Sequence, residues 1–180
     1  MKRLSIIVFA LCFFAMSSLF AKELMINKEM TSALKRFNNK FVHWKTNDYS
    51  RKVHMNALER KAVPWALALD VNGDKRNDIV LDGHDDKQSM LICLISEPAG
   101  YRVEVIKETP LENPRTIKSW NDGKKEKGLN YFLWPNSQSS TSFTKAYPQQ
   151  TDTSGKLLND GVMYDYIFEN AKFQEKYQVL

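Results

Sequence analysis

From Trp65 to the C-terminus, the sequence consists of short apolar segments separated by turn-forming residues. Segments of about four to eight such residues between turn signals are typical of β-strands. The segments are WALALD, DIVLD, SMLICLIS, YRVEVIKE, GLNYFLW, GVMYDYIF and KFQEKYQV. The last two are separated by Glu169, Asn170 and Ala171, and they predict a closing hairpin. Residues 136–156 are rich in Ser, Thr, Gln, Gly and Pro, so a loop-rich excursion is predicted at about 135–160.

A helical pattern precedes these strands. Met30, Leu34, Phe37 and Phe41 follow one another at spacings of four, three and four residues, which places them on one apolar face of a helix ending near Phe41. A further helical turn is predicted at 52–60. One helical segment followed by a run of strands favours an α+β fold, with the N-terminal helix packed on a mostly antiparallel sheet in a single domain at 22–180.

The first 21 residues have the pattern of a secretory signal peptide. Lys2 and Arg3 precede an apolar run at 6–16, and small residues at 17–21 precede the charged start of the remaining chain. The apolar run is shorter than the ~20 residues of a membrane-spanning helix. We therefore expect export to the periplasm or beyond, with no membrane span after cleavage. Cys93 is then the only cysteine, and its apolar surroundings predict a buried thiol without a disulfide.

The segment DVNGDKRND, residues 70–78, concentrates oxygen-bearing side chains in one short loop. Calcium prefers about six to eight oxygen ligands, and a tight loop with alternate residues turned inward supplies several of them. The predicted ligands are the side chains of Asp70, Asn72, Asp74 and Asp78, with the backbone carbonyl of Arg76. Two alternatives stay open at this point: a turn in which the aspartates cap backbone amides without a metal, and catalytic carboxylates.

The loop resembles the DxNGDGxxD element of FG-GAP and VCBS repeats, in which a calcium loop joins two antiparallel strands. WALALD and DIVLD flank it here in that way. Lys75 stands where the repeat has its second glycine, and a lysine at positive φ costs about 1 kcal/mol. Because a propeller needs about four or more four-stranded blades, we expect one such unit embedded in the α+β domain and not a complete propeller. Residues 48–86 are also similar to uncharacterised exported bacterial proteins, which implies no activity.

A second polar cluster, at residues 82–86, offers another candidate site. Asp82, His84, Asp85 and Asp86 combine a histidine with carboxylates, a donor set that suits zinc or manganese. The cluster would serve a metal-dependent hydrolase if His84 and at least two of the acids converged on one pocket. Nucleophile-elbow and nucleotide-binding motifs are absent from the sequence.

The remaining composition favours binding over catalysis. The net charge of +5 is spread along the chain, so a nucleic-acid partner is not expected. Aromatic residues gather late in the sequence, and most are expected in the core; if Trp134, Phe143 and Tyr147 lie on a loop, they can form a surface for a glycan or a peptide. The favoured hypothesis is a non-enzymatic exported binding protein, monomeric by default, with an unknown protein or glycan partner and a structural calcium loop. The alternatives are the hydrolase above and an inhibitor or subunit that acts through a protein interface.

Overall fold

The computed structural model describes residues 26–121, 123–136, 141–154, 156–159 and 161–179. The predicted signal peptide, residues 1–21, lies outside the described residues. The helices are α1 (Lys28–Phe37), α2 (Arg51–Glu59) and a short 3₁₀ turn at Thr46–Asp48. Within the described ranges, no helix is long and apolar enough to cross a membrane.

Five strands form the first sheet, in the order β1-β3-β4-β5, with β2 also paired to β3. All of these pairs are antiparallel. The strands are β1 (Val42–His43), β2 (Ala66–Leu69), β3 (Asp78–His84), β4 (Gln88–Glu97) and β5 (Gly100–Pro110). The predicted strand-loop-strand unit is confirmed, because β2 and β3 pair directly on either side of the aspartate loop.

The second sheet has four antiparallel strands in the order β13-β12-β9-β8. They are β8 (Phe132–Pro135), β9 (Ser142–Tyr147), β12 (Val162–Glu169) and β13 (Lys172–Val179). Two small hairpins complete the chain: β6 (Lys118–Asn121) with β7 (Lys124–Lys127), and β10 (Gln150–Thr151) with β11 (Leu157–Asn159).

The prediction of a loop throughout 136–156 is wrong for β9, which is paired on both sides. Its sequence SFTKAY contains Ser, Thr and Lys, which concealed the strand from a reading based on composition. The alternation is nevertheless present. Phe143 faces the inter-sheet core and is fully buried, and Lys145 and Tyr147 follow it at the two-residue period of a strand.

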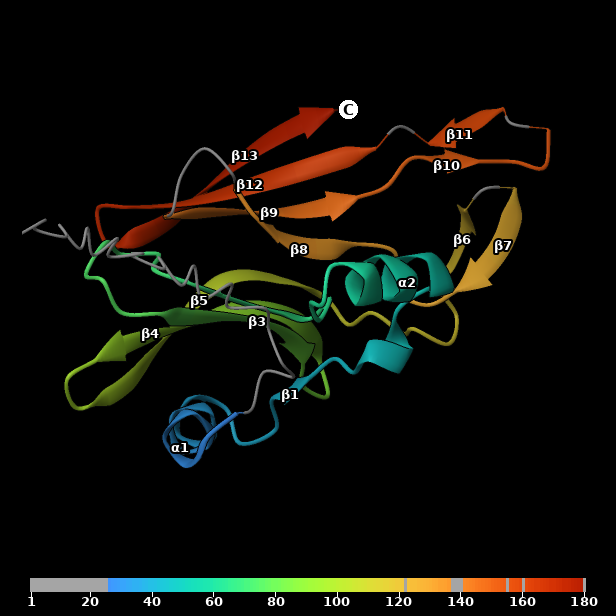
Figure 1. The fold of residues 1–180 in the computed structure, drawn as a ribbon. Coiled ribbons are helices and arrows are strands. Elements are labelled where there is room, and N and C mark those ends of the chain that lie inside the picture. The colour runs from blue at the N-terminus through green and yellow to red at the C-terminus, as the bar shows by residue number, and fades with distance from the viewer. Residues whose placement is uncertain (1–25, 122, 137–140, 155, 160, 180) are drawn as a thin grey trace, which may run out of the picture.

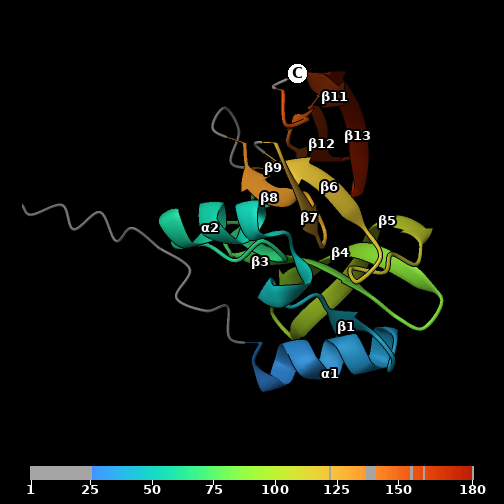
Figure 2. The same cartoon turned by 90° about the vertical axis from the view of Figure 1, so that its right-hand side faces the viewer.

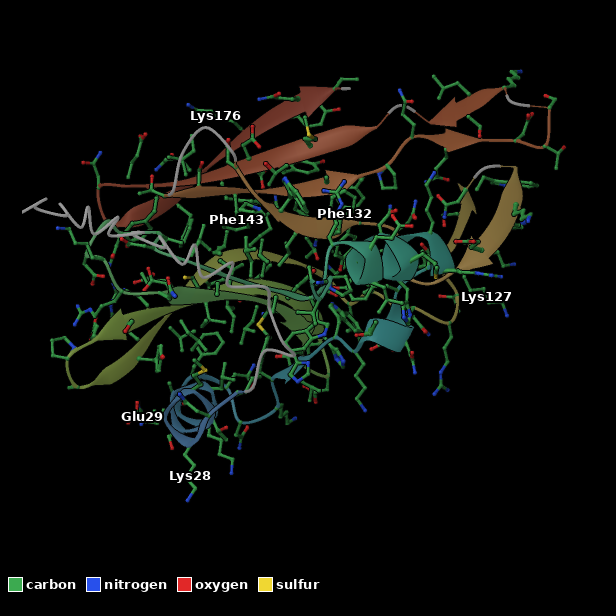
Figure 3. The ribbon with its side chains drawn as sticks, viewed as in Figure 1. Lys28, Glu29, Lys127, Phe132, Phe143 and Lys176 are labelled. Carbon is green, nitrogen blue, oxygen red and sulfur yellow. The ribbon has the colours of Figure 1, made fainter. Side chains whose placement is uncertain are left out.

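The two sheets lie face to face, and α1 covers the other side of the first sheet (Figures 1 and 2). Met30 and Leu34 of α1 are buried against the first sheet, as the helical spacing predicted, and Ala33 is buried with them. The helix ends at Phe37, so Phe41, which was predicted on the same helix face, lies outside it and packs against the core from the following segment. Figure 3 shows Lys28 and Glu29 on the side of α1 that points away from the sheets. Because β4 is covered on both faces, its seven residues from Ser89 to Ile95 are all buried, which explains the unbroken apolar run in SMLICLIS. The α+β architecture is thus confirmed, and it is not a propeller.

The predicted closing hairpin is also confirmed. Glu169 pairs with Lys172, so Asn170 and Ala171 form a two-residue turn between β12 and β13. Both turn residues have positive φ, 52° and 60°, as in a type I′ turn. The backbone twist of this turn matches the twist of the strands it joins.

Candidate functional site

The aspartate loop is organised by Asp70, which follows β2. Its Oδ1 accepts hydrogen bonds from the backbone N–H groups of Gly73 and Asp74, at 2.8 and 3.1 Å, and its Oδ2 accepts one from Lys75 at 2.8 Å. Asn72 Oδ1 also accepts from Asp74 N, at 3.0 Å. The side-chain oxygens of Asp70 and Asn72 therefore converge on the backbone N–H of Asp74. Lys75 has φ of 68°, the left-handed conformation expected where the repeat has glycine.

The other two acids of the loop are engaged elsewhere. The Arg76 guanidinium donates to Asp74 Oδ2 at 2.7 Å, and this pairing holds the pKa of Asp74 below its usual value. Asp78 begins β3 and is fully buried; its carboxylate accepts from Val71 N at 2.9 Å and Ser96 N at 2.7 Å. Burial raises the pKa of Asp78, and these two hydrogen bonds oppose the increase.

The donor set at Asp70, Asn72, Asp74 and Asp78 fits calcium chemically, but the loop closes through its own backbone amides. Among the residues that the structure describes, no three His, Cys, Asp or Glu side chains are gathered as a metal site. For Asp74 to face an ion beside Asp70, it would have to release Arg76. Calcium binding by this loop stays a prediction.

The cluster at residues 82–86 is divided between two places. Asp82 is buried between the sheets, whereas His84, Asp85 and Asp86 lie along an open groove of about 500 Å³ beside β1. Asp85 caps the β3–β4 turn by accepting from Lys87 N and Gln88 N, and Asp86 pairs with Lys40 at 2.6 Å. The His84 ring packs on Trp44, with centroids 4.2 Å apart. Three of the residues share the groove, but each is engaged with a different partner.

A cavity of about 110 Å³ lies between the two sheets, and both sheets contribute to its walls. Its lining combines hydroxyl, ammonium and carboxylate groups with tyrosine rings. The residues come from β3 (Asp82), β4 (Ser89, Met90, Leu91), β5 (Lys107, Thr109), β9 (Lys145, Tyr147) and β12 (Tyr164, Tyr166). A β-bulge in β5 shifts the register opposite Leu91 and Ile92, so that Lys107 faces Leu91 and reaches this cavity. We call this cavity the inter-sheet pocket.

At the inner end of the inter-sheet pocket, Lys145 approaches Asp82. Lys145 Nζ is 3.4 Å from Asp82 Oδ2, and both side chains are largely withdrawn from solvent. The same ammonium lies 3.7 Å from the centroid of the Tyr131 ring, within the range of a cation–π contact. The contact with Asp82 is an ion pair without hydrogen-bond geometry, since the buried Asp82 Oδ2 has no hydrogen-bond partner among the residues that the structure describes. A buried carboxylate oxygen in this state favours any ligand that donates a hydrogen bond to it.

Burial dominates the ionisation of this region. It raises the pKa of Asp82, and Lys145 opposes that change. It also raises the pKa of Glu112, whose Oε2 accepts from the Tyr131 hydroxyl at 3.1 Å. The tyrosine hydroxyls stay protonated at neutral pH, because burial raises the pKa of Tyr131 and Tyr147 further above the usual value. The inter-sheet pocket therefore presents tyrosine hydroxyls beside the ammonium groups of Lys107 and Lys145 and the Asp82 carboxyl group, whose ionisation burial opposes.

The sequence analysis singled out Asp82 and Tyr147 but missed Lys145, Lys107 and Glu112. Lys145 lay within the predicted loop, although its position midway between Phe143 and Tyr147 on an alternating strand was a usable signal. Nothing in the local sequence marks Lys107, because the bulge in β5 arises from pairing with β4. Glu112 was not identifiable either, since its role depends on Tyr131 from a distant segment.

The aromatic residues proposed as a loop surface lie on strands. Trp134 is on β8 with the Arg60 guanidinium 4.0 Å above its ring, and Phe143 is buried between the sheets (Figure 3). Only Tyr147 lines the inter-sheet pocket. Cys93 is free and fully buried as predicted, and burial raises the pKa of its thiol far above the usual value.

Comparisons with protein-family models, with curated proteins and with solved structures found no match for this chain. The resemblance to FG-GAP and VCBS repeats therefore rests on the loop sequence and on its position between β2 and β3.

Proposed function

We propose that the chain is an exported, non-enzymatic binding protein that holds a small polar ligand, or the end group of a larger one, in the inter-sheet pocket. The observation that carries this proposal is the buried Asp82 Oδ2, which lies in the wall of that pocket and has no hydrogen-bond partner in the described part of the chain. Pockets that combine aromatic walls with a few converging polar groups are the usual form of a small-molecule site. Export rests on the N-terminal sequence alone.

The contacts of the 82–86 cluster favour binding over the hydrolase alternative. That alternative required His84 and at least two of the acids to converge on one pocket. His84, Asp85 and Asp86 do line one groove, but among the described residues they are not gathered as a metal site. His84 is instead packed on Trp44, while Asp85 and Asp86 are held by the β3–β4 turn and by Lys40. Cys93 is no alternative nucleophile, because its thiol is buried and its pKa is raised.

We also propose that residues 70–78 form a structural calcium loop, with Asp70, Asn72, Asp74, Asp78 and the Arg76 carbonyl as ligands. The proposal is supported by the convergence of Asp70 and Asn72 and by the left-handed conformation of Lys75. The ion would tie β2 to the start of β3, the strand that carries Asp82. The loop would in this way stabilise one wall of the inter-sheet pocket.

The binding function is tested by thermal unfolding of residues 22–180 with four probes: glucose, acetate, glycine and glycerol. A ligand at ten times its Kd stabilises the folded state by about 1.4 kcal/mol, which raises Tm by roughly 3–6 °C for a chain of this size. We expect at least one probe at millimolar concentration to raise the Tm of the parent but not of Lys145→Met.

The matched control is Lys176→Met, which makes the same change on exposed β13 (Figure 3) and should keep the full shift. The absence of a shift with all four probes, or a shift that persists in Lys145→Met, would contradict the proposal.

A further inference from the structure

We propose that the ligand of the inter-sheet pocket is an oligosaccharide, with its terminal sugar in the pocket and the next sugar against Tyr164 and Tyr177 at the rim. This inference rests on the proposed binding function and names its ligand class. Three independent features of the pocket carry it: a continuous line of tyrosines, a balance of charges and the limited size of the cavity.

The tyrosines form an aromatic wall that runs from the core to the surface. Ring centroids are 5.1 Å apart for Tyr131 and Tyr147, 5.9 Å for Tyr147 and Tyr164, and 5.4 Å for Tyr164 and Tyr177. Tyr131 is buried at one end of the line, and Tyr177 is 58% exposed at the other. Tyr177 on β13 therefore extends the wall of the inter-sheet pocket beyond its rim.

The ionic groups of the pocket occur as pairs of opposite charge. Asp82 faces Lys145 at the inner end, and Lys107 donates to both carboxylate oxygens of Glu175 at the rim, at 2.8 and 2.7 Å. An anionic ligand would meet Asp82 and Glu175, and a cationic ligand would meet the two lysines. A neutral polyol avoids both conflicts, because each sugar hydroxyl can donate to a carboxylate and accept from an ammonium group.

The volume of the cavity limits how much of the ligand it encloses. A cavity of about 150 Å³ is large enough for a benzene ring, and the inter-sheet pocket has about 110 Å³. It can therefore enclose only part of one sugar ring, so an oligosaccharide must continue outward over the rim. The rim offers the exposed ring of Tyr177, a flat apolar surface of the kind that packs against the C–H face of a sugar.

The test compares glucose with cellotriose, maltotriose and triacetylchitotriose by titration calorimetry on residues 22–180. At least one trisaccharide should bind more tightly than glucose. Tyr177→Ala should weaken binding of that trisaccharide by about three- to tenfold, the range for a lost aromatic contact, and leave glucose binding unchanged. Tyr177→Phe should restore the trisaccharide affinity, because the ring and not the hydroxyl makes the contact.

Val179→Ala is the matched control, since Val179 lies on the same strand and is also 58% exposed. It should leave every affinity unchanged. Binding of a trisaccharide that is insensitive to Tyr177→Ala, or binding of acetate or glycine in the absence of any sugar binding, would overturn the oligosaccharide inference and leave the binding function standing. If no probe of any class binds, both proposals fail.

Discussion

At the scale of single residues, Asp82 makes the stability of the fold depend on pH. Burial raises its pKa in the folded state above the usual value of 3.8. The stabilisation that arises from this raised pKa is therefore fully present below about pH 3.8 and is lost as the pH rises through the pKa of Asp82 in the folded state. It amounts to about 1.4 kcal/mol for each unit by which the pKa values of the folded and unfolded states differ. We expect the free energy of unfolding of the parent, measured relative to Asp82→Asn, to fall between pH 4 and 7. Chemical denaturation at several pH values measures this difference.

Asp86→Asn is the control for this experiment, because it should give the opposite sign. The exposed Asp86 is paired with Lys40, which holds its pKa below the usual value. The stabilisation from the Asp86–Lys40 pair is present above the pKa that Asp86 has in the unfolded chain, and it is lost as the pH falls. The parent should therefore gain stability relative to Asp86→Asn as the pH rises from acid. The prediction for Asp82 would be contradicted if the difference in free energy of unfolding between the parent and Asp82→Asn did not change with pH, or rose with it. Either result would show that Asp82 ionises readily in the folded protein.

At the scale of elements, the hairpin between β12 and β13 contains a removable strain. Ala171 has φ of 60°, a left-handed conformation that costs a residue with a Cβ about 1–2 kcal/mol. Glycine adopts this conformation freely, and Asn-Gly is the preferred pair for a type I′ turn. Ala171→Gly should therefore raise the free energy of unfolding by about 1 kcal/mol, as measured by urea denaturation.

The matched control lies in the turn between β4 and β5, where Ala99 does not have a positive φ. Ala99→Gly removes no backbone strain, and it increases the conformational entropy of the unfolded chain. It should therefore lower the free energy of unfolding by about 0.4–1 kcal/mol. Equal effects of the two substitutions would mean that the Ala171 conformation is not strained.

The elements differ in how far their sequences determine them. The spacing of Met30 and Leu34 identified the buried face of α1, and the short break at 169–171 between two strand-like segments identified the hairpin, because both patterns are local. β9 was missed because Ser142 and Thr144 are residue types common in loops. The apolar Phe143 between them, which is buried, was the local sign of a strand. The register shift that places Lys107 in the inter-sheet pocket depends on the pairing of β5 with β4, which no local pattern reveals.

At the scale of the whole molecule, the inter-sheet pocket exists only because two sheets pack face to face. Asp82 and Lys145 are 63 positions apart in the sequence and lie on strands of different sheets. The sequence predicted strands and one antiparallel sheet, but it did not show that β8, β9, β12 and β13 would form a second. The aspartate loop was identifiable because all its donors lie within nine residues, whereas the inter-sheet pocket draws its lining from five strands.

Calcium tests whether the loop stabilises this whole assembly. After chelation, residues 22–180 should release or absorb heat on calcium titration that saturates near the ~10⁻⁴–10⁻³ M range of extracellular sites. Calcium should raise the Tm of the parent and should fail to raise that of Asp70→Ala or Asp74→Ala. Each variant is compared with and without calcium, because Asp70 also caps three backbone amides and its loss weakens the metal-free loop.

Two further variants decide between a metal loop and a self-capped turn. Asp152→Ala removes an aspartate that caps a turn through Ser154 N and Lys156 N, outside the 70–78 loop, so its calcium shift should equal that of the parent. Lys75→Gly removes a positive charge and the strain of φ at 68°, so it should bind calcium more tightly and be more stable without it by about 1 kcal/mol. If Lys75→Gly is stabilised equally with and without calcium, and the parent shows no shift, then the loop between β2 and β3 is a turn closed by the backbone hydrogen bonds of Asp70 without a metal.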